Sequence, residues 1–263
     1  MTNSKIVFDQ QHYETLNSAR SESVKHLLPP LIKRLGLRTV IDIGCGVGHF
    51  TSLLQEMGLD AVGIDGREKN LVEAKRRYPN LKFQLADAQE LDSRSIGSVD
   101  LVFCFGLIYH LENPFRLIRS IAAMNPKLAL VEGMVYPSSE PVLVLMDEPA
   151  LDDQALNYLA FYPSESCLAK MLRGAGFAHC YLPSEMPTHE NYEIGNTGFR
   201  KRSLIIASGT EVASPALEPF PFPVSPFRPW RMFPLKLRKG ITTRFREAGR
   251  RILKGEAEVA DWE

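Results

Sequence analysis

Cysteine, net charge and long apolar runs are all scarce in this chain of 263 residues. The four cysteines, at positions 45, 104, 167 and 180, form no C-x-x-C pair, so we expect buried thiols in a reducing compartment rather than disulfides or a metal site. No apolar run approaches the roughly 20 residues that span a bilayer, and the first residues are polar, which predicts a cytoplasmic protein without a signal peptide. Basic and acidic residues number 31 each, so the whole chain has no charge bias.

The most informative stretch is residues 40–50, in which an apolar strand pattern runs into three glycines and then an amphipathic helix pattern. Glycine is required where the backbone turns sharply and approaches a ligand too closely for a Cβ, and the start of a helix offers unpaired N–H groups. A second apolar strand follows one helix later and ends at Asp65, where a carboxylate is placed to accept from ribose hydroxyls. The pattern predicts a nucleotide-type cofactor site.

Two details distinguish this motif from a dinucleotide site. The glycines are spaced G-x-G-x-G rather than G-x-G-x-x-G, and Asp42 precedes the first of them, where a carboxylate would repel a pyrophosphate. A cationic cofactor without phosphate fits better. In these residues the sequence resembles the class I S-adenosylmethionine-dependent methyltransferases, over roughly residues 39–133 with a weaker continuation to residue 207.

The resemblance implies S-adenosyl-L-methionine as the cofactor and S-adenosyl-L-homocysteine as the product. By position, the glycine motif would lie along the methionine portion, Asp65 would bind the ribose, and Asp87 with Ala88 would contact the adenine. The residues assigned to the cofactor are Asp42, Gly44, Cys45, Gly46, Gly48, Asp65, Gly66, Asp87, Ala88 and Phe105.

Strand and helix patterns alternate along the chain as in an α/β, Rossmann-like, doubly wound sheet. Strands are expected at residues 39–43, 61–64, 82–85, 101–105, 128–132, 178–182 and 202–208. Helices are expected at residues 67–78, 115–124 and 165–173, where Pro79 ends the first, Pro114 opens the second and Ser164 caps the third. Seven strands would complete the sheet that the resemblance implies.

The expected division of the chain is an N-terminal helical cap over residues 1–37, a methyltransferase domain over residues 38–209, and a tail over residues 210–263. Within the domain, residues 134–163 form a long connection after the fifth strand. Long connections at the carboxyl ends of parallel strands are often functional. The cap and this insertion are therefore candidate substrate lids, with ordinary packing as the alternative.

The segment after the fourth strand, residues 104–114, contains the candidate catalytic residues. Methyl transfer from a sulfonium is an in-line displacement, so the enzyme mainly aligns the reactants, and a base is needed only where the acceptor loses a proton. His110 is the candidate base, because a neutral imidazole accepts a proton, and a hydrogen bond to the loop backbone is the alternative. Tyr109 would orient the acceptor or the sulfonium, with a core aromatic role as the alternative.

A narrower resemblance rests on Gly106, Tyr109 and His110, on the strand that ends in Glu132, and on residues 161–177. These features are similar to the catalytic domain of the bacterial wobble-uridine tRNA carboxymethyltransferases and their relatives. By position, the similarity implies that Phe105, Tyr109 and a basic residue among 200–202 face the ligand. The candidate substrate-binding residues are Tyr13, Arg20, Glu132 and Arg202, with a structural hydrogen bond as the alternative role of Glu132.

Charge is distributed unevenly along the chain. Residues 1–209 contain 21 basic and 24 acidic side chains, a poor footprint for RNA, so we do not expect nucleic acid to be a partner of the core. Residues 214–234 are rich in proline and phenylalanine and are expected to run extended over the surface. Residues 228–254 hold ten basic residues against one acid, with apolar residues at helical spacing. Such a tail would pack on its own domain or on a second subunit of a homodimer, or dock on a protein or on the inner face of a membrane.

Together these observations predict S-adenosylmethionine-dependent methyl transfer to an oxygen, nitrogen or activated carbon atom of a small or carrier-linked acceptor, such as a glycan, a lipid-linked sugar or a secondary metabolite. A tRNA-modifying methyltransferase is one alternative. A non-catalytic module that keeps the cofactor fold and docks through its tail is another. The glycine motif does not identify the acceptor, because specificity in this fold lies in its variable insertions.

Overall fold

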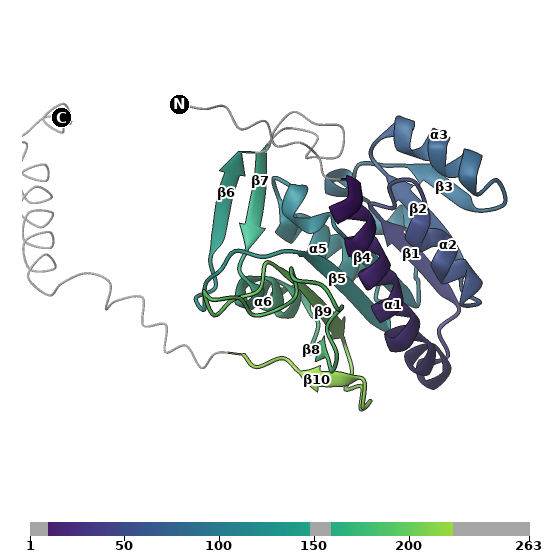
Figure 1. Cartoon of the computed structure of the whole chain (residues 1–263). Helices are drawn as coiled ribbons and strands as arrows, with labels where there is room; N and C mark the ends of the chain where they lie inside the picture. Colours follow the sequence, from purple (N-terminus) through teal and green to yellow (C-terminus); the bar gives the residue numbers. More distant parts are fainter. Residues whose placement is uncertain (1–9, 148–158, 223–263) are drawn as a thin grey trace, which may run out of the picture. The chain divides into compact units, whose positions relative to one another are not determined.

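The computed structural model describes residues 10–147 and 159–222, which are built around one eight-stranded sheet (Figure 1). Its strands, in the order β10-β8-β9-β5-β4-β1-β2-β3, are β1 (Thr39–Ile43), β2 (Asp60–Asp65), β3 (Lys82–Leu85), β4 (Leu101–Phe105), β5 (Leu128–Met134), β8 (His179–Pro183), β9 (Arg202–Ser208) and β10 (Leu217–Pro219). Strands β1 to β5 are parallel, and β9, β8 and β10 add to them in antiparallel pairing. The α/β doubly wound fold is confirmed.

Helices connect the parallel strands and cover both faces of the sheet. They are α1 (Gln10–Leu35), α2 (His49–Glu56), α3 (Glu68–Arg77), α4 (Ser93–Ile96), α5 (Pro114–Ala123) and α6 (Glu165–Ala175), with short 3-10 turns η1 (Ala88–Glu90) and η2 (Ile108–His110). The predicted cap of α6 is confirmed, because the Ser164 side chain accepts from the backbone N–H of Cys167 at 3.2 Å. In the described part of the chain, no helix is long and apolar enough to cross a bilayer.

The core lies on both faces of the sheet because the side chains of its central strands are buried on both faces, and β4 is apolar at every position. Along β4, Val102 and Cys104 belong to one buried cluster, whereas Leu101, Phe103 and Phe105 belong to the other. Helices α5 and α6 pack in the first cluster, and α1 and α2 pack in the second. Figure 1 shows α1 crossing the sheet on the same side as α2. Helix α1 therefore packs directly against the sheet.

The prediction of seven strands was wrong by one. All seven predicted strands form, with ends within two residues of the expected positions, and β10 is the additional strand. It pairs with the outer side of β8 through Leu217, Glu218 and Pro219. A proline cannot donate to a ladder and is tolerated in an edge strand, which is why a proline-rich segment still extends the sheet here. The compact unit of the structure accordingly extends to Phe222.

The insertion after β5 forms a second, separate sheet of two antiparallel strands, β6 (Leu143–Asp147) and β7 (Leu159–Pro163). It reaches the main domain through Tyr162, whose ring meets that of Tyr109 at 5.5 Å in an edge-to-face arrangement. The residues between these strands lie outside the described part, as does the basic tail from residue 223 onward. The predictions for those two segments stay predictions.

Candidate cofactor and acceptor site

A cavity of about 980 Å³ lies at the carboxyl ends of the parallel strands, where ligands bind in open α/β sheets. Most of the residues predicted from the sequence line it: Arg20, Gly44, Cys45, Gly46, Asp65, Gly66, Asp87, Ala88, Phe105, Tyr109, His110 and Arg202. Three predicted residues, Asp42, Gly48 and Glu132, do not line it. Tyr13 belongs to α1, but its side chain lies outside the described part of the structure.

The glycine loop is folded so that Gly46 lies open to the cavity. The backbone N–H groups of Gly44 and Cys45 both donate to the Ile64 carbonyl, which ties the loop to β2. Gly46 has φ +53°, and a Cβ built there would have no atom within 4 Å. Gly48, with φ +84°, faces inward instead, and its Cβ would lie 2.7 Å from Phe83. Gly46 therefore leaves space for a ligand, whereas Gly48 leaves space for the core.

Asp65 holds the glycine loop as well as facing the cavity. One of its oxygens accepts from the N–H of Gly46 at 2.9 Å, and the other accepts from the N–H of Arg67 and from the amide of Asn70. A carboxylate offers about four lone pairs, so one remains for a ligand hydroxyl. Asp87 is exposed at the same end of the cavity and accepts from the N–H of Gln89. Two acids thus mark the predicted ribose and adenine end.

Asp42 lies behind the loop rather than in the cavity. It is 2% exposed, and the Thr51 hydroxyl of α2 donates to it at 2.6 Å. Burial raises the pKa of Asp42 to about 7, although the Thr51 hydrogen bond opposes this shift. The side chain therefore connects β1 to α2 and does not meet a ligand directly.

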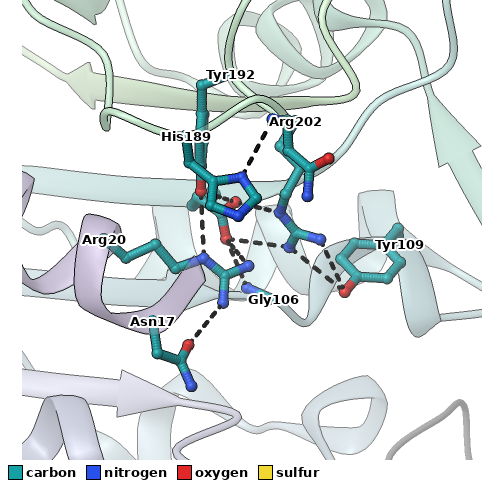
Figure 2. Close-up of polar contacts among 9 residues, drawn as sticks. Asn17, Arg20, Gly106, Tyr109, His189, Tyr192 and Arg202 are labelled. Carbon is teal, nitrogen blue, oxygen red and sulfur yellow. Dashed lines mark hydrogen bonds and ion pairs between the residues drawn. The ribbon is translucent and has the colours of Figure 1, made fainter. Parts of the chain in front are cut away.

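The other end of the cavity is built on a buried carboxylate, Glu132, toward the carboxyl end of β5, two residues before its end. Arg20 of α1 reaches one of its oxygens at 3.0 Å, and Arg202 of β9 reaches the other at 2.7 Å. The Tyr192 hydroxyl donates to Glu132 at 2.5 Å, and the N–H of Gly106 donates at 3.1 Å. Figure 2 shows the guanidinium groups of Arg20 and Arg202 side by side, with Tyr109 next to Arg202. Four distant segments therefore meet at one buried side chain.

These contacts determine the charge states of Glu132 and of the side chains around it. Burial disfavours the ionised form of Glu132, but the charges of Arg20 and Arg202 outweigh it and hold its pKa at about 2. Burial raises the pKa of Tyr192, and the neighbouring carboxylate raises it further. The cluster at neutral pH therefore consists of two guanidinium ions, one carboxylate and the neutral phenol of Tyr192.

Tyr109 and His110 lie together on η2 at the cavity wall. Their rings are 4.1 Å apart, and the Arg202 guanidinium lies 5.2 Å from the centre of the Tyr109 ring. The terminal nitrogens of Arg202 also donate to the Tyr109 hydroxyl at 3.4 and 3.5 Å. The structure thus orients Tyr109 through Arg202, so that its hydroxyl oxygen is occupied while its proton is available.

Two residues at the site, His49 and Tyr192, were not predicted from the sequence. His49, directly after the glycine motif, lines the cavity, and its Nε2 lies 2.8 Å from the hydroxyl of Ser21 on α1. Burial lowers the pKa of His49. Its place next to Gly48 was a signal that could have identified it. Tyr192 had no such signal, because it lies 172 positions from its partner Arg20.

Comparison with known proteins gives the family. Residues 16–181, more than half of the chain, match the family described as a methyltransferase domain. This chain belongs to that family. The methyltransferase is 26% identical over 173 residues to the tRNA U34 carboxymethyltransferase of Campylobacter jejuni, which is 63% of this chain and 58% of that protein. It is 29% identical over 114 residues to the ubiquinone biosynthesis O-methyltransferase of Albidiferax ferrireducens, which is 41% of this chain and 43% of that protein.

The chain therefore spans less than two thirds of the length of these relatives. Among solved structures, the N-terminal domain of EvdMO1 with S-adenosylhomocysteine bound has a TM-score of 0.57 at 20% identity. The match covers 72% of this chain and 79% of the EvdMO1 domain. Magnesium protoporphyrin IX methyltransferase from Synechocystis PCC 6803 with bound S-adenosylmethionine has a TM-score of 0.52 at 18% identity. That match covers 78% of this chain and 86% of the Synechocystis protein. At these identities the likeness shows the shared fold.

S-adenosylmethionine is the cofactor that the family implies, and the residues of this cavity fit it. Gly46 leaves the space that the methionine portion needs, and Asp65 keeps an acceptor position for a ribose hydroxyl. Phe105 and Tyr109 line the cavity, and aromatic surface is compatible with an adenosine or a sulfonium ion. No cationic side chain contacts Asp65 or Asp87 in the described residues, which suits a ligand that brings hydroxyl and amino donors.

Proposed function

We propose that this methyltransferase transfers the methyl group of S-adenosylmethionine to an oxygen, nitrogen or activated carbon atom of a small or carrier-linked acceptor. One observation carries the proposal: a single cavity is lined at one end by the glycine loop with Asp65 and Asp87, and at the other by Tyr109 and His110. A cavity of about 980 Å³ is at the upper end of small-molecule sites and leaves room for a second molecule beside the cofactor.

The bound cofactor supplies a methyl group on a positively charged sulfur, ready for in-line displacement. The chain's own residues do the positioning. The glycine loop and Asp65 hold the cofactor, Phe105 and Tyr109 cover it from water, and the aromatic faces stabilise the positive charge. His110, on the same wall, takes the proton that an oxygen or nitrogen acceptor loses on methylation.

The first experiment is isothermal titration of the full chain with S-adenosylmethionine and S-adenosylhomocysteine. Asp65→Ala is expected to weaken both by about 1–3 kcal/mol, because a charged hydrogen bond to the ligand and the support of Gly46 are lost together. Asp60→Ala is the matched control, because Asp60 lies at the opposite end of β2 in an exposed pair with Lys82. Absence of binding to either compound, or equal binding by both variants, would refute the cofactor assignment.

His110 is tested by turnover. Formation of S-adenosylhomocysteine is followed while pools of hydroxyl, amine and carbon acceptors are supplied. His110→Ala is expected to lose at least about tenfold in turnover with oxygen or nitrogen acceptors and to bind S-adenosylhomocysteine as the parent does. Unchanged turnover would reduce His110 to a structural role. A chain that binds the cofactor but methylates nothing in such pools would instead support a non-catalytic docking module.

A tRNA acceptor is the second candidate, favoured by the relatives that are named tRNA U34 carboxymethyltransferases. The acidic balance of residues 1–209 opposes it, whereas the ten basic residues of 228–254 could supply the phosphate contacts. Binding of tRNA is measured at several salt concentrations with the full chain and with a chain lacking residues 235–263. Strong, salt-dependent binding that needs this tail would favour RNA over a small molecule.

A further inference from the structure

One hydrogen bond joins α1 to the helix that follows the glycine loop. The Nε2 atom of His49, the first residue of α2, lies 2.8 Å from the hydroxyl oxygen of Ser21 on α1. Both residues line the cavity, and both helices lie on the same face of the sheet (Figure 1). The bond therefore closes the cavity wall between α1 and α2, directly beside the glycine loop.

The direction of this bond follows from the second partner of Ser21. Its hydroxyl donates its single proton to the backbone carbonyl of Asn17 at 2.8 Å. Toward His49 the hydroxyl is therefore an acceptor, and Nε2 of His49 is the donor. Burial lowers the pKa of His49, so the ring at neutral pH is uncharged, with its proton on Nε2. The bond thus requires an N–H group at the position of Nε2, and it does not require a charge.

Both partners are held in place by their surroundings. Ser21 is 7% exposed. The ring of His49 meets that of Phe50 edge to face at 5.0 Å, and Phe50 in turn lies 5.3 Å from the rings of Phe103 and Phe105. A hydrogen bond between groups that are already ordered costs little further side-chain entropy. The bond between His49 and Ser21 is therefore more favourable than one between two mobile surface side chains.

The bond holds a helix that forms one wall of the cavity. Asn17, Ser21 and Lys25 are four positions apart on α1 and all line the cavity, so one face of the helix runs along it. The cavity-lining part of α1 is tied to β5 through Arg20 and to α2 through Ser21, the next residue. The link from Ser21 to His49 is the one that keeps this wall beside the glycine loop, where the cofactor is expected.

We propose that His49 is a positioning residue, which acts through Ser21 to hold α1 against the cofactor half of the cavity and thereby slows release of the cofactor. The inference rests on the proposed function, since it assumes that S-adenosylmethionine occupies this half. A ligand that lies between the glycine loop and α1 leaves faster when the wall is held less firmly. Loss of the bond should therefore appear chiefly in the dissociation rate.

The test measures the dissociation rate of S-adenosylhomocysteine from the full chain by surface plasmon resonance. Ser21→Ala and His49→Asn are expected to raise this rate about fivefold, the equivalent of one hydrogen bond. His49→Gln is expected to keep the parent's rate, because the amide nitrogen of glutamine reaches about as far from the backbone as Nε2, whereas that of asparagine does not. Ser52→Ala is the matched control, since Ser52 lies on the same helix and forms an exposed hydrogen bond with Glu56.

A double variant tests whether the two residues act through one another. Ser21→Ala combined with His49→Asn should release the ligand no faster than either single variant, because both remove the same bond. Additive effects would overturn the proposal, as would equal rates for His49→Gln and His49→Asn.

Urea unfolding of each variant separates positioning from stability. Variants that are less stable in urea but release S-adenosylhomocysteine at the parent's rate would give the pair a purely structural role and overturn the proposal. The proposed function fails differently, because S-adenosylhomocysteine would then not bind the parent chain at all.

Discussion

Replacing Glu132 by glutamine is expected to destabilise the fold by about 3 kcal/mol or more. The pKa of Glu132 falls from 4.5 in a free side chain to about 2 in the folded chain, and each unit is worth about 1.4 kcal/mol. Removing one member of a buried ion pair costs about 3–5 kcal/mol in general, which agrees with this estimate. Glu132→Gln keeps the shape of the side chain but leaves Arg20 and Arg202 buried without a counter-charge.

The assay is urea unfolding followed by far-ultraviolet circular dichroism, at neutral pH and at several values down to pH 3. Because the folded pKa lies below the unfolded one, the contribution of Glu132 is complete above about pH 4.5 and is lost as pH falls toward 2. The difference in the free energy of unfolding between Glu132→Gln and the parent should therefore decrease as pH falls below about 4.5. Glu90→Gln is the control, since Glu90 pairs with Arg116 on the surface and should change stability by less than about 0.5 kcal/mol. Equal stability of Glu132→Gln and the parent at neutral pH would refute the reasoning.

Two further substitutions test the cofactor half. Asp42 has a pKa of about 7 in the folded chain and 3.8 in the unfolded chain, so the parent should lose stability as pH rises from 4 to 7. Asp42→Asn should lack this loss. Over this range the change in the free energy of unfolding should therefore differ between the two proteins by about 4 kcal/mol. Parallel pH curves for the two proteins would mean that Asp42 is ionised when folded. A Cβ on Gly63 would lie 2.8 Å from Phe83 and 2.9 Å from Cys45, so Gly63→Ala should cost about 1–3 kcal/mol, whereas Gly209→Ala, with nothing within 4 Å, should not. The Tm values of Gly63→Ala and Gly209→Ala are measured by circular dichroism. Equal Tm values for the two variants would contradict this account.

The sheet could be predicted from the sequence because its signals are local. An apolar run of five or six residues, such as 101–105, is visible without knowledge of its neighbours. Strand β10 has only three residues, the last of them Pro219, and becomes a strand only because the edge of β8 is free to pair with it. Residues 217–219 do not themselves indicate that the edge of β8 is free to pair, which is why the eighth strand was not predicted.

The two halves of the site also differ in how far the sequence predicts them. The glycine loop and Asp65 lie within a short stretch of chain and were found by spacing alone. The spacing did not show which residues turn away from the cavity, and Asp42 and Gly48 do so because α2 and β3 pack against them. At the other end, the candidates Arg20, Glu132 and Arg202 were named separately, but their meeting at one carboxylate depends on tertiary packing. Tyr192 completes that cluster and could be found only in the fold.

The long separation of the groups around Glu132 has a consequence for the life of a newly made chain. The residues assigned to the cofactor are all made by residue 105, whereas Tyr192 and Arg202 are the last of the partners of Glu132 to be made. Roughly 100 residues of synthesis separate the two sets, which at about 5–20 residues per second takes about 5–20 seconds. Until then Glu132 lacks two of the groups that compensate its buried charge. A newly made chain is therefore expected to bury this carboxylate only after β9 has been synthesised.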